Sequence, residues 1–302
     1  MNAEMTDAND QSAMMNRAST KQRQLDYLRT LRFSSPQGEV NEDTIVRELL
    51  FVFQGIDGML IKYQLLEDAY VLSTTVTVSP STHKLICELC ELGWLFKKVS
   101  DWVNRNGGDS VNMQVNQVTQ SLCFAIQAEL TEYYRLLAVL DSQRVNYKYD
   151  DSANYLNLRK LYLWVQEPLE RMKWLAVITD LVQNLKGGAI CSAINTYVLN
   201  GSPSTKHFIS RILKEVSTPI LSMIKTWMVA GEINDPFQEF FVETDPNVGD
   251  DKLWTEKYKL NYVMIPAFLT NNLANKILQT GKAVNFIRRC CDEQDWILDV
   301  SL

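Results

Sequence analysis

The stretch LICELCELGWLFKKVSDWV, residues 85–103, decides the fold class. Its apolar residues recur at alternating steps of four and three, which places one continuous stripe along a helix of about five turns. Start and stop signals flank the stretch, with Ser79-Pro80-Ser81 before it and Asn106-Gly107-Gly108 after it. The stripe consists of Leu85, Leu89, Leu92, Phe96, Val99 and Val103.

The same spacing predicts two more long helices. The first carries a stripe of Leu122, Ile126, Leu130, Tyr133, Leu137 and Leu140. The second begins near Ser202-Pro203, ends at Gly231, and carries Ile209, Ile212, Val216, Ile220, Met223 and Trp227. Shorter helices are expected at 44–53, 156–165, 168–185, 189–199 and 274–290.

One region departs from helical spacing. Residues 55–78 hold a glycine-rich turn followed by a β-branched run with partial alternation, which predicts a small β-hairpin between two helices. No linker rich in proline and serine divides the chain after residue 40, and long helices with short connections pack as bundles. The sequence therefore predicts an all-α fold: an elongated helical bundle, residues 41–302, with a small inserted β-hairpin. Residues 1–40 are expected to be a mostly disordered lead-in.

Charge and hydropathy restrict the function classes. The net charge of −6 and the pI near 5.1 argue against nucleic-acid binding, which needs a basic face. No apolar run approaches the ~20 residues of a membrane span, and no signal peptide opens the chain. We therefore expect a cytoplasmic protein that does not bind nucleic acid and has no membrane span.

Two patterns suggest metal sites, and both are incomplete. Cys87 and Cys90 form a C-x-x-C inside an apolar helical run, but no second pair completes a four-ligand zinc site, so two reduced core thiols are expected. Residues 245–256 resemble a calcium loop with Glu256 in the twelfth position. Gly249 stands one place before the position that an EF-hand requires. No metal or other cofactor is predicted.

The stretch GEINDPFQEFFVETDP, residues 231–246, is the strongest candidate site. One hypothesis is acid–base chemistry by its carboxylates, drawn from Asp235, Glu239, Glu243 and Asp245. The other is structural: Gly231 ends a helix, Asp235-Pro236 makes a turn, and Phe240 and Phe241 re-enter the core while the acidic groups stay solvated.

Catalytic signatures are otherwise missing from the sequence. Each of the two histidines, His83 and His207, stands near a predicted helix start and is expected in a first turn at the surface. Gly107-Gly108 and Gly187-Gly188 lack the lysine of a phosphate-binding loop and indicate helix breaks. The chain is not predicted to be an enzyme.

Six stretches in order resemble the gamma-tubulin complex component family. In GEINDPFQEFFV the matching residues are Gly231, Glu232, Asp235, Pro236, Glu239, Phe240 and Phe241, while Ile233 replaces the family's leucine. Gly93 and Trp94 belong to a second stretch, CELGWLFKKV at 90–99, which with LTEYYRLLAVLDSQ at 130–143 is most similar to the third component. The others are VRELLFVFQGIDG (46–58), LWTEKYKLNYVMIPAFL (253–269) and ILQTGKAVNFIRRCC (277–291).

The resemblance implies a structural subunit of the gamma-tubulin complex, at a microtubule organizing center such as a centrosome or spindle pole. All six stretches are similar to the N-terminal half of the family, which associates laterally with other components to form the template for microtubule nucleation. The implied partner is another component, most of all the second. Gamma-tubulin is bound by the C-terminal half, which is expected to be absent here, so direct binding is expected only of a full-length protein. The alternative is a helical adaptor or tether unrelated to tubulin.

Overall fold

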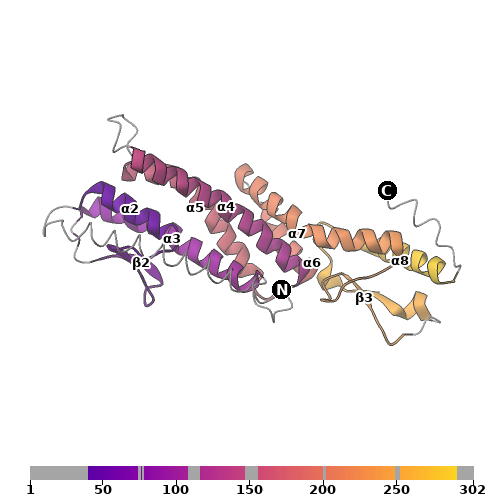
Figure 1. Cartoon of the computed structure of the whole chain (residues 1–302). Coiled ribbons are helices and arrows are strands. Elements are labelled where there is room, and N and C mark those ends of the chain that lie inside the picture. Colours follow the sequence, from indigo (N-terminus) through magenta and orange to yellow (C-terminus); the bar gives the residue numbers. More distant parts are fainter. Residues whose placement is uncertain are drawn as a thin grey trace, which may run out of the picture. The chain divides into compact units, whose positions relative to one another are not determined.

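A computed structural model describes residues 40–73, 76, 78–107, 116–146, 156–199, 202–248 and 252–290. The predicted disordered lead-in, residues 1–40, lies outside the described residues apart from Val40. Residues 41–302 belong to one compact unit. Its α-helices are α2 (Glu42–Val52), α3 (Pro80–Asn106), α4 (Gln117–Asn146), α5 (Leu158–Leu181), α6 (Gly187–Val198), α7 (Pro203–Ala230) and α8 (Asn271–Cys290) (Figure 1).

The apolar stripes predicted from the sequence form the core. Every residue of the α4 stripe is buried, and so are the stripes of α3 and α7 except for Leu85 and Met223, which are half-buried. Helix α7 packs against α4, α6 and α8, whereas α3 packs against α5, and α2 contacts α3, α4 and α5. The all-α fold class is confirmed.

Local signals set the helix ends. The Ser79 hydroxyl accepts the Thr82 N–H at 3.2 Å at the start of α3, and Asn157 accepts the Lys160 N–H at 2.8 Å at the start of α5. Side-chain caps of this kind satisfy amides that have no partner inside the helix. Gly231 ends α7 in the left-handed conformation, with φ of +64°.

One predicted helix break is wrong. The sequence predicts separate helices at 156–165 and 168–185, because proline removes an intrahelical hydrogen bond. The structure instead has one helix, α5, with Pro168 inside it. The apolar residues on both sides of Pro168, such as Leu161 and Leu175, are buried, and α5 packs along α3. Tertiary packing therefore outweighs the cost of the proline.

The predicted hairpin is present, and a second strand pair forms a separate sheet. Strands β1 (Ile61–Gln64) and β2 (Ala69–Leu72) pair antiparallel, with Ile61 opposite Leu72. Strands β3 (Val242–Thr244) and β4 (Tyr258–Leu260) also pair antiparallel, with Val242 opposite Leu260. This second pair was not predicted from the sequence, because strands of three residues are too short to show an alternating pattern. A π-helix (Leu253–Lys257) and a 3-10 helix (Tyr262–Met264) flank β4.

Candidate functional site

The segment 231–242 joins α7 to β3 and lies where several helices meet. Gly231 begins it: its N–H donates to the Trp227 carbonyl at 3.1 Å, and its own carbonyl accepts the Asn285 side-chain N–H of α8 at 2.6 Å. A Cβ at position 231 would come within 2.6 Å of the Asn285 backbone nitrogen. Both its positive φ and this close approach therefore require glycine.

Glu232 and Arg288 connect the same helix end to α8. The two side chains form an ion pair, and Arg288 Nη1 also donates to the Ala230 carbonyl at 3.1 Å. A cation at a helix C-terminus is favourable, because unpaired carbonyls there carry partial negative charge. Arg288, a residue of α8, thus binds the last turn of α7.

Asp235 and Pro236 form the predicted turn. Asp235 Oδ2 accepts the Phe240 N–H at 2.7 Å, so this carboxylate closes the loop that Pro236 begins. Gln238 within the loop has φ of +57°, a left-handed conformation that the closed turn holds in place. The turn directs Glu239, Phe240 and Phe241 toward the interior.

Glu239 contradicts the expectation that the acidic groups are solvated. Its side chain is 0% exposed. Its Oε2 accepts the Gln117 N–H at 2.7 Å and its Oε1 accepts the Val118 N–H at 3.1 Å. These are the first amides of α4, so a residue more than a hundred positions away caps that helix. The Glu239 backbone carbonyl also accepts the Gly188 N–H of α6 at 3.3 Å.

Burial raises the pKa of the Glu239 carboxyl above its ordinary value of 4.5, and hydrogen bonds from Val118 and Gln117 oppose that shift. Desolvation disfavours the charged form, whereas amide donors and the positive end of α4 favour it. A buried carboxyl with helix amides as its partners is typical of a structural cap.

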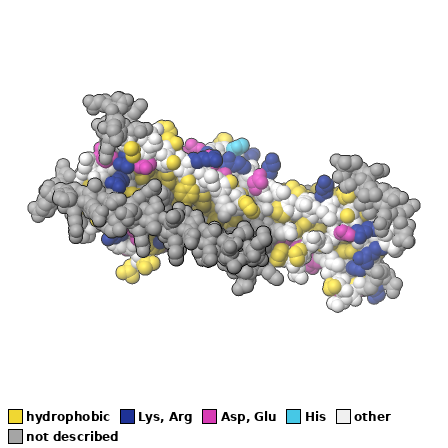
Figure 2. All heavy atoms as spheres, in the orientation of Figure 1, with side chains coloured by type: hydrophobic (Ala, Val, Ile, Leu, Met, Phe, Trp, Pro, Cys, Tyr) yellow, Lys and Arg dark blue, Asp and Glu magenta, His cyan; other side chains and the backbone are white. Residues whose placement is uncertain are grey.

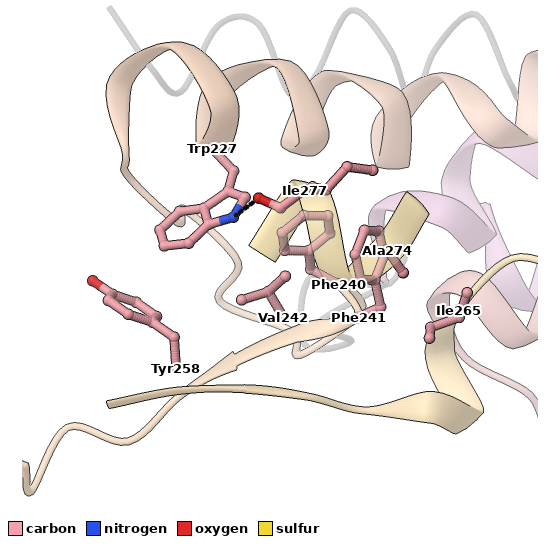
Figure 3. Packing of buried hydrophobic residues seen from close by; sticks show 8 residues of the cluster. All are labelled: Trp227, Phe240, Phe241, Val242, Tyr258, Ile265, Ala274 and Ile277. Atoms are coloured by element: carbon pink, nitrogen blue, oxygen red, sulfur yellow. Dashed lines mark hydrogen bonds between the residues drawn. The ribbon is translucent and has the colours of Figure 1, made fainter. Parts of the chain in front are cut away.

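An aromatic cluster lies beneath the turn (Figure 3). Phe240 and Phe241 are buried, with ring centroids 4.5 Å apart. The Trp227 indole N–H donates to the Ile277 carbonyl of α8 at 3.1 Å, and its ring centroid lies 4.8 Å from that of Tyr258 in β4. The cluster is drawn from α7, the turn, the second strand pair, the residue after the 3-10 helix and α8, and consists of Trp227, Phe240, Phe241, Val242, Tyr258, Ile265, Ala274 and Ile277.

The segment 231–242 and its contacts with α4, α6, α7 and α8 form what we call the junction. The other two predicted site residues lie on α3 and outside this junction. Gly93 is buried against α2, where a Cβ would overlap the Val52 carbonyl. Trp94 is half-buried and its indole, like the Tyr63 hydroxyl, donates to Asp68 in the turn of the β1–β2 hairpin. Gly93 therefore allows close helix packing, while Trp94 supports the hairpin.

Sequence reasoning missed Trp227, Asn285 and Gly281 as parts of the junction. Gly281 faces Trp227 so closely that a Cβ would overlap the indole ring. A glycine in the middle of a helix, such as Gly281 in α8, is the signal that could have found this contact, because such a glycine needs a packing reason.

The carboxylates suggested for acid–base chemistry all have structural partners. Beyond Asp235 and Glu239, Glu243 accepts the Asn261 side-chain N–H at 2.7 Å, and Asp245 accepts the Asn247 N–H at 3.0 Å. Across the ranges that the structure covers, no three His, Cys, Asp or Glu side chains are placed to hold a metal ion. None of the helices described is long and apolar enough to cross a membrane.

The expectation of two core thiols is half wrong. Cys90 is buried, but Cys87, three residues earlier on α3, is exposed, and its Sγ lies 3.6 Å from Nδ1 of the exposed His83. A helix places residues three apart on neighbouring rows, so one thiol of the pair can face solvent. His83 and His207 both lie exposed near the start of a helix, as predicted.

The fold and the junction together define the class of protein. It is an all-α protein in which the segment 231–242 connects several helices through hydrogen bonds and buried side chains. The chain belongs to the gamma-tubulin complex component family, since the family profile "Gamma tubulin complex component N-terminal" matches residues 46–301. The members of this family are structural components of a complex and do not form an enzyme class.

Individual relatives agree with the family assignment. The chain is 40% identical over 265 residues to "Gamma-tubulin complex component 3" of Arabidopsis thaliana, which covers 86% of this chain and 32% of the relative. It is 39% identical over 261 residues to the human protein of that name, covering 85% of this chain and 28% of the relative. "Spindle pole body component 98" of Dictyostelium discoideum is 32% identical over 305 residues, covering 84% and 37%. The chain thus spans about a third of the length of these relatives.

Proposed function

We propose that this chain is a structural subunit of a gamma-tubulin complex that takes part in lateral assembly of the template for microtubule nucleation. The observation that carries the proposal is the family match over residues 46–301, which includes almost every described residue. The names of the relatives point to the same complex and to the spindle pole body. We expect the chain at a microtubule organizing center of the cytoplasm.

The junction supports a scaffolding role. Glu239 fixes the start of α4, Arg288 binds the end of α7, and Trp227 bonds to α8. A unit tied together in this way can transmit load from one neighbour to the next without changing shape, because buried packing deforms little. A lateral scaffold needs this rigidity, whereas acid–base catalysis needs carboxylates that can reach a substrate.

We propose other components of the complex as partners, with the second component first. A "Gamma-tubulin complex component 2" of Mus musculus is itself 27% identical to this chain over 260 residues, and this similarity supports a related component as the partner. Direct binding of gamma-tubulin is proposed only for a full-length component. Catalysis, a metal or other cofactor, and nucleic acid have no part in the proposal.

Co-purification tests this function. The tagged chain is mixed with the second component alone and with gamma-tubulin alone, and a helical bundle of similar charge serves as the control bait. We expect the second component to be retained by the chain and not by the control. Retention of neither component nor gamma-tubulin would favour the alternative, a helical adaptor or tether without a tubulin connection.

A further inference from the structure

Residues 252–290, which include the π-helix, β4 and α8, differ in charge from the rest of the chain. They contain seven Lys and Arg residues and one acidic residue, Glu256, which forms an ion pair with Lys252 at 3.2 Å. This stretch therefore has a net charge of +6, whereas the whole chain has −6 and the remaining residues −12. Figure 2 shows a group of Lys and Arg side chains on the part of the molecule that carries β4 and α8. A basic region in an acidic chain suits an acidic ligand.

One exposed surface joins the π-helix to α8. Lys282 Nζ of α8 donates to the Trp254 carbonyl of the π-helix at 2.9 Å. Lys282, Phe286 and Arg289 follow one another at steps of four and three, so they lie along one side of α8. The exposed fraction is 52% for Trp254 and 45% for Phe286. We call the surface made by Trp254, Lys282, Phe286 and Arg289 the α8 surface.

Lys282 lies in this surface beside a neutral group. Partial burial lowers the pKa of its ammonium, and the group to which it donates is a carbonyl. Among the residues that the structure describes, no carboxylate forms an ion pair with Lys282, because Glu256 bonds to Lys252 and Glu243 bonds to Asn261. A carboxylate placed beside a partly desolvated ammonium would offset the cost of its burial. A ligand with both carboxylates and an apolar group therefore matches the α8 surface.

The chain itself contains a segment of this chemistry directly after α8. Residues 292–299 lie outside the described residues and begin two positions after Cys290, the last residue of α8. The six residues from Cys290 to Trp296 can span up to about 20 Å, whereas Lys282 lies about 12 Å back along the helix. We call residues 292–299 the acidic segment, since they contain no Lys or Arg and carry Asp292, Glu293, Asp295 and Asp299 around Trp296, Ile297 and Leu298.

We propose that the acidic segment folds back along α8 and covers the α8 surface, with Trp296 packed against the exposed rings and the carboxylates beside the cations. An aromatic ring next to Lys282 and Arg289 also gains from the attraction between a cation and a ring face. The contact is a cover formed within one chain, and it goes beyond the lateral assembly proposed above.

Charge and tethering favour this occupant over other acidic molecules. A segment joined to its site by a few residues has an effective concentration of about millimolar, so it competes well with a separate acidic peptide. A nucleic acid carries phosphates along its whole length and would meet the net negative charge of the remaining residues. A separate acidic partner would therefore have to displace the acidic segment before it could bind the α8 surface.

Intramolecular cross-linking tests the contact directly. The chain carries Leu298→Cys with Gln279→Cys, in a background with all six native cysteines replaced by serine. Gln279 is exposed and lies seven positions before Phe286, hence on the same side of α8. Thr280→Cys, the exposed neighbour one step around the helix, replaces Gln279→Cys as the matched control. We expect the disulfide within one chain to form at least tenfold faster with Gln279→Cys than with Thr280→Cys. Equal rates, or no disulfide with either position, would overturn the proposal.

Competition by a fluorescent decaglutamate peptide identifies the occupant. A tail variant has the four carboxylates of the acidic segment changed to amides, which weakens the cover. We expect this variant to bind decaglutamate at least fivefold more tightly than the parent chain. A control variant makes the same charge change at four exposed acids of α3 and α4 and should bind more weakly than the tail variant: Glu88→Gln, Glu91→Gln, Glu132→Gln and Asp141→Asn.

The other outcomes contradict the proposal. Equal affinity of the tail variant and the parent chain would mean that the surface is open to a separate acidic partner and that the stated occupant is wrong. Equal tightening in the tail and control variants would show a general effect of net charge. Failure of decaglutamate to bind any of the chains would show that the α8 surface is no site for an acidic segment. Neither experiment includes another component, so the proposed lateral assembly is tested apart from this inference.

Discussion

Glu239 Oε2 lies 2.7 Å from the backbone nitrogen of Gln117, and this hydrogen bond joins the turn after α7 to the first amide of α4. The bond spans 122 positions of the chain. Helix starts are usually capped by a residue next to them in sequence. Here the cap comes from the turn after α7, which explains why a buried glutamate follows Pro236 and precedes Phe240 and Phe241.

The first prediction concerns the pH dependence of stability. Burial raises the pKa of folded Glu239 above its ordinary value of 4.5, so its protonated form favours the folded state. This contribution is fully present below pH 4.5 and is lost as the pH rises through the folded pKa. We expect the free energy of unfolding of Glu239→Gln, measured relative to the parent chain, to increase as the pH rises from 4.5 toward neutrality.

Denaturant titrations at several pH values measure this difference. Glu243→Gln, which removes an exposed carboxylate from the same segment, is the matched control and should follow the parent chain more closely. If plots of the unfolding free energy against pH run parallel for Glu239→Gln and the parent chain, the pKa of this carboxyl does not change on folding.

The second prediction concerns Gly281 and Trp227. Alanine is favoured over glycine in a helix by about 1 kcal/mol, so Gly281→Ala would stabilise an exposed helix. Here the added Cβ would overlap the Trp227 indole, and overpacking costs about 1–3 kcal/mol or more. We expect a lower melting temperature for Gly281→Ala. The exposed neighbour Thr280→Ala should melt within a degree or two of the parent chain.

A smaller residue at position 227 tests whether contact with the indole ring causes the destabilisation by Gly281→Ala. Trp227→Leu removes the ring that the new Cβ meets, so Gly281→Ala should be less destabilising in that background than in the parent chain. Equal effects of Gly281→Ala in both backgrounds would show that the loss arises elsewhere in α8.

The third prediction concerns the buried aromatic pair. Phe240→Ala or Phe241→Ala should each destabilise the protein by about 3–5 kcal/mol, because each truncation leaves a cavity in the cluster. Phe286→Ala, which truncates an exposed ring of α8, should cost far less. Chemical denaturation measures all three. Unchanged stability together with loss of a partner would mean that Phe240 and Phe241 are contact residues.

Sequence periodicity predicted the helices because their buried stripes are long. The stripe from Leu122 to Leu140 repeats over five turns of α4, and each of its members is buried. Strand β3 has three residues, and Pro168 gives a local signal that distant packing overrides. Short strands and tolerated prolines depend on partners that local sequence does not identify.

The candidate site was predictable only in part. Gly231 and the Asp235-Pro236 turn follow from local backbone rules, and both were predicted correctly. The role of Glu239 depends on the α4 amides more than a hundred positions away, so no local rule indicates that it is buried. Acidic residues in a turn are usually solvated, and this general tendency gave the wrong expectation.

The last prediction concerns the thiols. Burial raises the pKa of Cys90 to about 12 and the pKa values of Cys123 and Cys191 to about 11, so these thiols stay protonated and unreactive. Cys87 is exposed and can reach a reagent. In a chain with Cys290→Ser and Cys291→Ser, we expect a maleimide at neutral pH to label Cys87 alone in the folded protein and all the remaining thiols in denaturant. Mass spectrometry of the labelled chain locates the modified positions. Adding Cys87→Ser should abolish rapid labelling, whereas rapid labelling of Cys90 would show that α3 opens locally and that its buried face is less stable than its packing against α5 implies.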